Sequence, residues 1–310
     1  MNKPYLSVVI PVYNESENLE QLYQRLIATL DKGNKSYEII FINDGSRDDS
    51  YEQLNALQKR RPKQIRVIHF NGNFGQHMAV MAGFERVKGE VIITLDADLQ
   101  NPPEEIANLL CSIDEGHDYV GGVRKNRQDT FFRRYASKLN NWLRYKITKI
   151  RLSDQGCMLR AYRRSLIDLM ISSKETSLFI PAQAYSLSTN PTEIEVAHDI
   201  RRAGASKYNI YRLLRLNFDL MTGFSLLPLQ VFTMLGLLIS VLSSFFVVYM
   251  LLRRFAVGPE AEGVFTLFAI VLMGLGIMGE YIGRIYQEVR HRPRYVIKEV
   301  IDVENQGKPS

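Results

Sequence analysis

The sequence predicts an α/β fold with a mainly parallel sheet, because short apolar runs alternate with helical patterns through the first 130 residues. The run at residues 91–95 is continuous, apolar and rich in β-branched side chains, which is typical of a strand buried on both faces. Asp96, Asp98 and Gln100 follow it directly, ahead of two prolines. Because ligands bind at the carboxyl ends of strands in open α/β sheets, these polar residues mark the predicted site.

The other elements of the sheet domain are expected on either side of this run. Each expected strand is a short apolar segment bounded by turn residues, and each expected helix repeats apolar residues every three or four positions. The expected strands are residues 6–15 (ending in a loop), 38–46 (ending in a turn), 66–70 and 118–124. The expected helices are residues 19–30, a helix capped by Ser46 or Asp48, residues 76–87, and a proline-started helix that runs through residue 110.

Composition and charge narrow the class of protein. The chain has 310 residues, of which 46% are hydrophobic and 23% charged, as is usual for a globular protein and not for a disordered one. The net charge of +6 favours an anionic partner, such as nucleic acid, a phosphorylated small molecule or a membrane surface. Cys111 and Cys157 have no metal-ligand spacing and form no disulfide framework. Residues 1–13 lack a small-residue cleavage site, so no signal peptide is expected.

Two basic amphipathic helices are expected beyond this domain, at residues 131–149 and 206–224. In each, aromatic and aliphatic side chains form one stripe, and Arg and Lys occupy other positions. A single helix of this kind is usually a packed surface helix. Two of them beside a membrane-spanning segment favour a position in the membrane interface.

The expected membrane-spanning segment is residues 226–252, which carry no charge and are long enough to cross a hydrocarbon core of roughly 30 Å. A second apolar run, residues 263–279, is at the short end of the range for a span, so a tilted or re-entrant hairpin is the alternative. Arginines after this run outnumber those in the loop between the two runs. The positive-inside bias therefore places both termini, and the sheet domain with them, in the cytoplasm.

The carboxylate pair after residue 95 suits a hard divalent cation. Residues i and i+2 of a strand point the same way, so Asp96 and Asp98 are expected to face one cation. Mg²⁺ and Mn²⁺ take oxygen ligands of this kind and share them with substrate phosphates. Most Asp-x-Asp sequences are solvated turns, so the motif is weak by itself. On a membrane-anchored α/β domain it suggests metal-assisted transfer from a nucleotide.

Four stretches together resemble glycosyltransferases of family 2, in the polyprenyl-phosphate branch. They are Pro11-Val-Tyr-Asn-Glu15, Asn43-Asp-Gly-Ser46, Asp96-Ala-Asp-Leu-Gln-Asn-Pro-Pro103 and Gly279-Glu-Tyr-Ile-Gly-Arg-Ile-Tyr286. Three more resemble the transferases of 4-deoxy-4-formamido-L-arabinose for lipid A modification better than bactoprenol glucosyltransferases. They are Asn73-Phe-Gly-Gln-His77, Val123-Arg-Lys-Asn-Arg-Gln-Asp129 and Gly156-Cys-Met-Leu-Arg-Ala-Tyr-Arg-Arg164. The resemblance covers nearly the whole chain.

The resemblance implies a GT-A-type (Rossmann-like) domain that transfers a sugar from a UDP-sugar to undecaprenyl phosphate, or another polyprenyl phosphate, with inversion. It also implies Mg²⁺ or Mn²⁺ as cofactor, a homo-oligomer (a tetramer) and the bacterial inner membrane as location. The expected domains are residues 1–130, the nucleotide-sugar-binding core; 131–225, the rest of the catalytic domain with the interface helices; 226–283, the transmembrane helices; and 284–310, a basic cytoplasmic tail.

The resemblance also implies roles for matched residues. Asp98, with Gln100 and Asp96, is expected to hold the cation, although a polar residue at a helix start is the alternative for Gln100. The expected contacts to uracil and ribose are Pro11, Tyr13, Glu15 and Asp44. Asn43 stands where many relatives carry Asp, so no role is assigned to it. His77 and Cys157 are expected to be packed rather than reactive.

The acceptor changes the usual argument about a general base. A lipid phosphate is mostly anionic, with a second pKa of about 6, so Asp154 is expected to orient a substrate more than to abstract a proton. A surface turn is the alternative for Asp154. An anionic nucleophile needs cations to approach a diphosphate. The expected catalytic set is Asp154, Asp96, Arg124 and Arg127, and the expected acceptor-phosphate set is Arg201, Arg202, Lys207 and Arg133. Attraction to anionic headgroups is the alternative for Arg133.

Three other functions remain to be weighed against this hypothesis. A bactoprenol glucosyltransferase that uses UDP-glucose is the alternative within the class. A non-catalytic nucleotide-sugar-binding membrane scaffold is the alternative outside it, and intact Asp96, Asp98, Gln100 and Asp154 argue against that interpretation. A transporter is disfavoured because two short spans provide no repeat and no midplane site. A nucleic-acid partner is not expected, because the basic residues accompany a hydrophobic hairpin.

Overall fold

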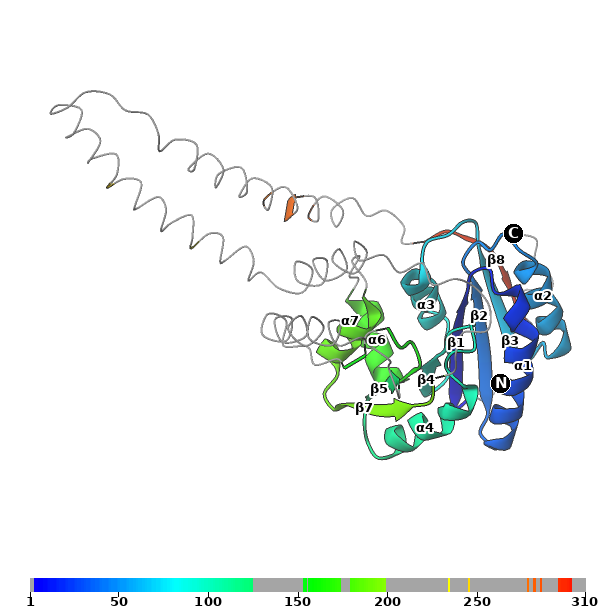
Figure 1. The fold of residues 1–310 in the computed structure, drawn as a ribbon, viewed down its shortest axis with the longest axis horizontal. Coiled ribbons are helices and arrows are strands. Elements are labelled where there is room, and N and C mark those ends of the chain that lie inside the picture. Colours follow the sequence, from blue (N-terminus) through cyan, green and yellow to red (C-terminus); the bar gives the residue numbers. More distant parts are fainter. Residues whose placement is uncertain are drawn as a thin grey trace, which may run out of the picture. The chain divides into compact units, whose positions relative to one another are not determined.

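The structure is a computed structural model that describes residues 3–124, 153–154, 156–173, 179–198 and 295–302, with six single positions between 234 and 285. The chain divides into two compact units. The first comprises Met1–Ala136, Ile150–Lys207 and Pro293–Ser310. All the described ranges belong to this unit, and the six single positions belong to the second. The first unit is an α/β domain (Figure 1).

Within the described ranges, one eight-stranded sheet has the order β7-β5-β6-β4-β1-β2-β3-β8. The strands are β1 (Leu6–Val12), β2 (Tyr37–Asn43), β3 (Ile65–Phe70), β4 (Val91–Thr94), β5 (Tyr119–Arg124), β6 (Arg160–Arg163), β7 (Pro191–Val196) and β8 (Ile297–Ile301). The four central strands β4, β1, β2 and β3 are parallel, as predicted. β6 and β8 run antiparallel to their neighbours, whereas β5 and β7 are parallel to each other.

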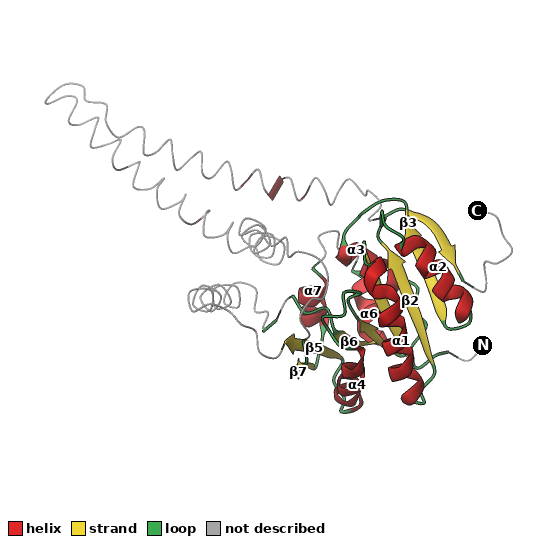
Figure 2. Cartoon of the chain, turned by 45° about the vertical axis from the view of Figure 1, so that its right-hand side comes forward, coloured by secondary structure: helices red, strands yellow, loops and turns green. Residues whose placement is uncertain are grey.

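Helices cover both faces of the sheet (Figures 1 and 2). They are α1 (Ser16–Lys32), α2 (Ser50–Arg60), α3 (Gln76–Phe84), α4 (Ile106–Asp114), α6 (Arg164–Ser172) and α7 (Ile180–Leu187), with a short 3-10 helix η1 (Pro103–Glu105) before α4. Apolar side chains of α1, α2 and α4 pack on one face in a single core. α3 packs on the other face, where Gly83 lies against Val9 and Ile42. Burial on both faces explains the continuous apolar runs of the central strands.

The predicted elements are found with small shifts at their ends. Leu19, Leu22, Leu26 and Leu30 are buried along α1, which confirms the helical spacing. α3 ends at Phe84, before the expected residue 87. The proline-started helix begins as η1 and continues as α4 to Asp114. β4 ends at Thr94, so Asp96 and Asp98 lie in the turn beyond the strand.

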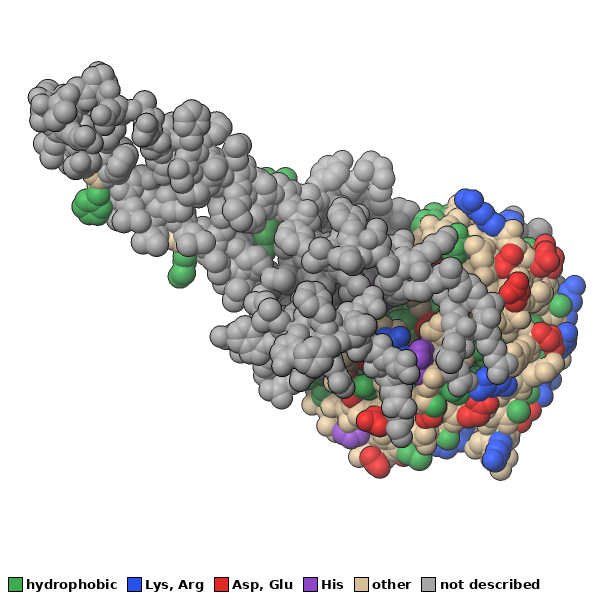
Figure 3. Space-filling view, viewed as in Figure 1, with side chains coloured by type: hydrophobic (Ala, Val, Ile, Leu, Met, Phe, Trp, Pro, Cys, Tyr) green, Lys and Arg blue, Asp and Glu red, His purple; other side chains and the backbone are tan. Residues whose placement is uncertain are grey.

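Strand β8 comes from the segment expected to be a basic tail. It pairs with β3, more than 200 residues away in the sequence. Tyr295 stacks on Phe70 with ring centroids 5.0 Å apart, and Arg66 Nε lies 3.6 Å from Asp302 Oδ2. On the face drawn in Figure 3, acidic and basic side chains of the first unit are intermingled. Residues 295–302 are therefore part of the sheet domain.

The expected amphipathic helices at residues 131–149 and 206–224 lie outside the described residues. The expected spans, residues 226–252 and 263–279, are described at three positions, and Met234, Phe245 and Met278 are helical there. The side chains of Met234 and Phe245 are 75% and 71% exposed. Among the described residues, none of the helices combines the length and the apolar character needed to cross a membrane.

Candidate active site

Predicted site residues from several strands meet at one edge of the sheet. Pro11 lies at the carboxyl end of β1, and Arg124 is the last residue of β5. Asp44 directly follows β2, and Asp96 follows β4 by two residues. The charges of Asp98, Glu15 and Arg124 all act on Asp96, so these loops converge. The expectation that ligands meet the carboxyl ends of parallel strands therefore points to this edge.

The loops after β1 and β2 hold each other in place. The Asn14 N–H donates to Ser46 Oγ at 3.0 Å, and the Arg47 N–H donates to Asn14 Oδ1 at 2.8 Å. Asn14 adopts a positive φ of 54°, which Asn tolerates better than most residues. Tyr13 beside it is 43% exposed. The result is a fixed rim that presents an aromatic ring to solvent.

Asp44 lies behind this rim, and its carboxylate accepts three hydrogen bonds from the loop after β3. The Phe74 N–H donates to Oδ1 at 2.7 Å, while the Gly75 N–H and the Asn73 Nδ2 donate to Oδ2 at 2.9 and 3.0 Å. Burial raises the pKa of Asp44, and the two backbone donors counteract that rise. These donors use three of the roughly four acceptor sites of the carboxylate, and the expected nucleotide contact of Asp44 stays a prediction.

Asp96, Asp98 and Gln100 lie on a tight turn. The Gln100 N–H donates to Asp98 Oδ1 at 3.1 Å, and the intervening Leu99 is buried with a positive φ of 61°. That φ is uncommon for Leu and marks local backbone strain. We expected Asp96 and Asp98 to face the same way because side chains alternate along a strand. That reason is wrong, since the strand ends before Asp96. The turn, not the strand alternation, brings them together.

Negative charge accumulates at this turn. Burial and, after it, the charges of Asp98 and Glu15 raise the pKa of Asp96 to about 7, against the opposing effects of Arg124 and Gln76. The described ranges contain no cluster of three or more His, Cys, Asp or Glu side chains that could hold a metal ion. The possible metal ligands at the turn are the carboxylates of Asp96 and Asp98 and the side-chain amide oxygen of Gln100. Mg²⁺ and Mn²⁺ prefer oxygen ligands of this kind. The residues present therefore fit a divalent cation.

Arg124 and Asp154 form a two-bond ion pair beside the turn. Arg124 Nε donates to Oδ2 at 2.6 Å and Nη2 donates to Oδ1 at 2.8 Å. The Gly156 N–H also donates to Oδ1, at 3.1 Å, and the Asp154 side chain is almost fully buried. A carboxylate bound in this way is suited to holding a guanidinium in place. The alternative of a solvated surface turn for Asp154 is wrong.

Sequence reasoning assigned no role to Arg160, although it lies in one of the stretches that carry the resemblance. Its side chain is fully buried. Nε donates to the Cys157 carbonyl and Nη2 to the Asp154 carbonyl, both at 2.7 Å, and Nη1 donates to the Tyr119 hydroxyl. Arg160 therefore supports the turn that carries Asp154. No local pattern marks a buried arginine in a four-residue strand.

The sequence predicted no role for His198 or Gln76 either. His198 follows β7, and burial together with Arg124 lowers its pKa, while Asp154 and Asp98 act in the opposite direction. It therefore lies beside both the turn and the ion pair. Gln76 is the first residue of α3, and its Nε2 donates to Asp96 Oδ1 at 2.5 Å. Gln76 also lies in a stretch that carries the resemblance, which was the available signal for it.

Of the remaining expected residues, Cys157 and His77 are described by the structure, and five cationic residues are not. Cys157 is buried, and burial raises the pKa of its thiol to about 11. His77 packs edge-on against Phe179, and burial lowers its pKa to about 4. Both are packed residues, as predicted. The other expected cations lie outside the described residues: Arg127, Arg133, Arg201, Arg202 and Lys207.

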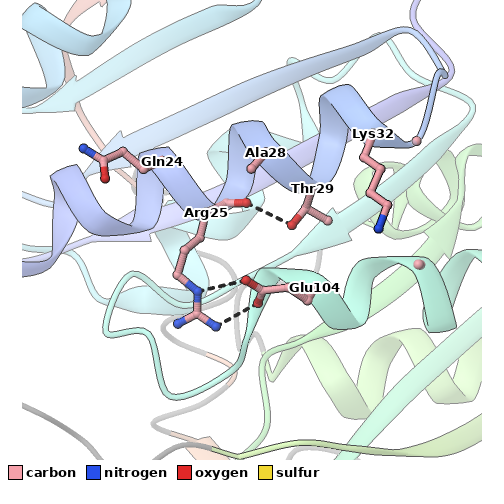
Figure 4. A pocket seen from close by; sticks show the side chains of 8 residues that line it. Gln24, Arg25, Ala28, Thr29, Lys32 and Glu104 are labelled. Atoms are coloured by element: carbon pink, nitrogen blue, oxygen red, sulfur yellow. Dashed lines mark hydrogen bonds and ion pairs between the residues drawn. The ribbon is translucent and has the colours of Figure 1, made fainter.

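An open hollow of about 670 Å³ lies elsewhere on the domain, between α1 and the η1–α4 segment (Figure 4). Arg25 crosses it to Glu104, with Nη2 2.8 Å from Oε2. Its lining includes none of the predicted site residues. The carboxylate turn is therefore the candidate active site, and the hollow is a separate surface feature.

Comparisons with known proteins identify the family of this chain. Residues 7–170 match the family model described as glycosyl transferase family 2. The chain is 47% identical over 306 residues to an undecaprenyl-phosphate 4-deoxy-4-formamido-L-arabinose transferase of Edwardsiella ictaluri, with 96% of this chain and 94% of the relative covered. It is 48% identical over 305 residues to the protein of the same name from Salmonella enteritidis, with 96% and 93% covered.

Among solved structures, the crystal structure of a mycobacterial protein aligns with a TM-score of 0.50 at 15% sequence identity, covering 71% of this chain and 73% of that one. At that identity the likeness concerns the fold alone. The family match covers more than half of the chain, and the relatives are similar along nearly its whole length. The predicted family is confirmed: this chain belongs to the family 2 glycosyltransferases and is an enzyme of glycosyl transfer.

Proposed function

We propose that this glycosyltransferase moves 4-deoxy-4-formamido-L-arabinose from a UDP-sugar to undecaprenyl phosphate, with inversion and with Mg²⁺ or Mn²⁺. The observation that carries the chemistry is the position of the Asp96–Asp98 turn beside the Arg124–Asp154 ion pair. The choice of sugar and acceptor rests on the names of relatives that are 47–48% identical over 96% of the chain.

The cation is assigned to Asp98, Gln100 and Asp96. A divalent ion there would neutralise charge on the leaving diphosphate as a Lewis acid. The surroundings of Asp96 support this assignment, because burial, followed by the charges of Asp98 and Glu15, raises its pKa against the opposing charge of Arg124. Deprotonated carboxylates are the form that a cation binds.

The UDP moiety is assigned to the rim formed by the loops after β1 and β2. Tyr13 presents an exposed ring on which a base can stack, and Pro11 and Glu15 flank it. The interlocked hydrogen bonds of Asn14 with Ser46 and Arg47 keep this rim rigid. A preformed rim reduces the entropy cost of binding.

The acceptor needs orientation and charge rather than a general base. One of its anionic phosphate oxygens attacks the anomeric carbon from the face opposite the leaving group; a carbon–oxygen bond to the acceptor forms as the bond to UDP breaks. Arg124, held by both oxygens of Asp154, presents a fixed guanidinium to phosphate oxygens. Arg127, Arg133, Arg201, Arg202 and Lys207 are proposed as further acceptor-phosphate contacts on sequence grounds.

The acceptor is a lipid, so we assign the enzyme to the bacterial inner membrane, with residues 226–283 as transmembrane helices and the catalytic domain and both termini in the cytoplasm. The uncharged run at 226–252 supports this topology. The large, exposed apolar side chains of Met234 and Phe245 on helices are what a lipid-facing surface presents. Membrane lipids and a homo-tetramer are the proposed partners, without nucleic acid.

A donor panel tests the proposal. Full-length protein in detergent, with Mn²⁺ and undecaprenyl phosphate, would receive UDP-4-deoxy-4-formamido-L-arabinose, UDP-glucose or UDP-N-acetylglucosamine, with the lipid product identified by mass spectrometry. Product with the first donor alone is expected. Product with UDP-glucose alone would replace the sugar and make the enzyme a bactoprenol glucosyltransferase. UDP binding without product from any donor would favour a scaffold. Asp98→Ala should abolish transfer while membrane association persists.

A further inference from the structure

We infer that Gln76 is a positioning residue for Asp96, and that Asp44 places Gln76 by building the loop before α3. This inference rests on the proposed function, because it concerns how the carboxylate turn is held for the donor and its cation. It assigns Asp44 a task that differs from direct contact with the nucleotide. Asp44, which follows β2, places Gln76, and Gln76 in turn positions Asp96, which follows β4.

The first step is the loop at residues 72–75. Its two backbone N–H groups at Phe74 and Gly75 and the side-chain amide of Asn73 all donate to the Asp44 carboxylate, at 2.7–3.0 Å. Asn73 Nδ2 also lies 3.2 Å from the Asp44 carbonyl. Hydrogen bonds to an ionised acceptor are among the stronger ones in proteins. Asp44 is thus the centre on which this loop folds.

The two loops also touch without side chains between them. Gly45 has φ +67°, and a Cβ there would lie 2.4 Å from the Gly72 carbonyl carbon. Backbone contact this close leaves the 72–75 loop little freedom to shift relative to β2. The loop position is therefore fixed from two sides.

The second step leads from the loop to the turn. Gly75, with φ +95°, precedes α3, and its carbonyl accepts the Met78 and Ala79 N–H groups of the first helical turn. The next residue, Gln76, is therefore held by the helix start on one side and by the Asp44-bound loop on the other. Its Nε2 donates to Asp96 Oδ1 at 2.5 Å. One amide donor is enough to select one orientation of a carboxylate.

This contact matters because Asp96 follows the end of its strand and lies on a strained turn. Leu99 at φ 61° and the Gln100 N–H bond to Asp98 shape the turn, but neither contacts the Asp96 carboxylate. Productive sites require side chains held to within a fraction of an ångström. Gln76 supplies that constraint from a neighbouring helix.

A double-mutant cycle on transfer activity tests the inference. Steady-state kcat/KM for the UDP-sugar would be measured for the unaltered full-length enzyme, Gln76→Ala, Asp96→Asn and the double variant. We expect Gln76→Ala to lower kcat/KM about tenfold, the scale of one charge-assisted hydrogen bond, and to cause no further loss in the Asp96→Asn background. Gln24→Ala is the matched control, because Gln24 Nε2 also donates to a carboxylate, Glu20 Oε1 at 3.1 Å, on α1; its activity should be unchanged.

Asp44→Asn extends the cycle. If Asp44 acts through the loop, its fold-loss should disappear in the Gln76→Ala background. If Asp44 contacts the nucleotide itself, the loss will persist there, and the assignment of Asp44 is overturned. A loss for Gln76→Ala that persists in the Asp96→Asn background would show that Gln76 contacts substrate directly, which overturns the positioning role.

Mn²⁺ binding to the same variants, followed by the EPR signal of free Mn²⁺, separates this inference from the proposed function. If the unaltered chain makes no glycolipid but binds Mn²⁺, the same non-additive pattern in affinity is expected. An additive pattern would overturn the inference alone. If the unaltered chain shows no transfer and no Mn²⁺ binding, the proposed function is overturned, and the inference with it.

Discussion

The pH dependence of cation binding follows from the charge around Asp96. In the metal-free protein its pKa is raised to about 7, so the carboxyl is about nine-tenths protonated at pH 6 and about nine-tenths ionised at pH 8. A divalent cation binds the ionised form, so a proton competes with it. The apparent affinity for Mn²⁺ should therefore rise about tenfold between pH 6 and pH 8. The same raised pKa means that the metal-free fold loses this group's contribution to stability as the pH rises through 7.

The assay is Mn²⁺ titration of the full-length protein in detergent, read by EPR, at several pH values. UDP-glucose without acceptor is the companion ligand, because its diphosphate does not titrate in this range. Asp96→Asn should bind Mn²⁺ more weakly and with a flat pH profile. Asp114→Asn is the matched control, since Asp114 bonds Tyr5 and Lys35 and its pKa is lowered. A flat profile in the unaltered protein, or a tenfold slope that survives in Asp96→Asn, would refute the reasoning.

Three further changes test other parts of the domain. Gly45→Ala forces a Cβ to 2.4 Å from the Gly72 carbonyl carbon at a positive φ, so thermal unfolding should show a loss of at least about 2 kcal/mol; an unchanged melting temperature would contradict the close approach. Arg124→Lys keeps the charge but not the two parallel bonds to Asp154, so kcat should fall about tenfold or more; full activity would mean that a point charge suffices. Ending the chain after residue 294 removes β8, so limited proteolysis should cut the sheet domain faster; unchanged resistance would make β8 dispensable.

The parallel centre of the sheet could be predicted because each of its strands is a self-contained signal. The runs at β1, β2 and β4 are apolar on both faces and end in polar turn residues. Parallel strands end at a common edge, so the positions of Pro11, Asp44 and Asp96 followed without knowledge of strand order. The site was therefore predictable as a location.

The edges of the sheet were not predictable, because their strands depend on tertiary contacts. β6 is four residues long and includes a fully buried Arg160, which resembles a surface segment in sequence. β8 carries two adjacent charged residues, Lys298 and Glu299, and its partner β3 lies more than 200 residues earlier. The turn at Asp96 was misjudged for a related reason: Leu99 takes a strained φ that no local propensity predicts.

The carboxylates at this edge differ in how the protein itself compensates them, and that difference indicates where a cation belongs. Asp44 is compensated by three N–H donors of the 73–75 loop, and Asp154 by the guanidinium of Arg124. Among the described residues, Asp96 receives one amide hydrogen bond and lies near Asp98 and Glu15; burial, followed by these two charges, raises its pKa to about 7 against the opposing charge of Arg124. A fold that satisfies two carboxylates from within and leaves the third among like charges gains most from a cation at that third position. Within the described part of the chain, the Asp96–Asp98 turn is therefore where the proposed cation would offset the most negative charge.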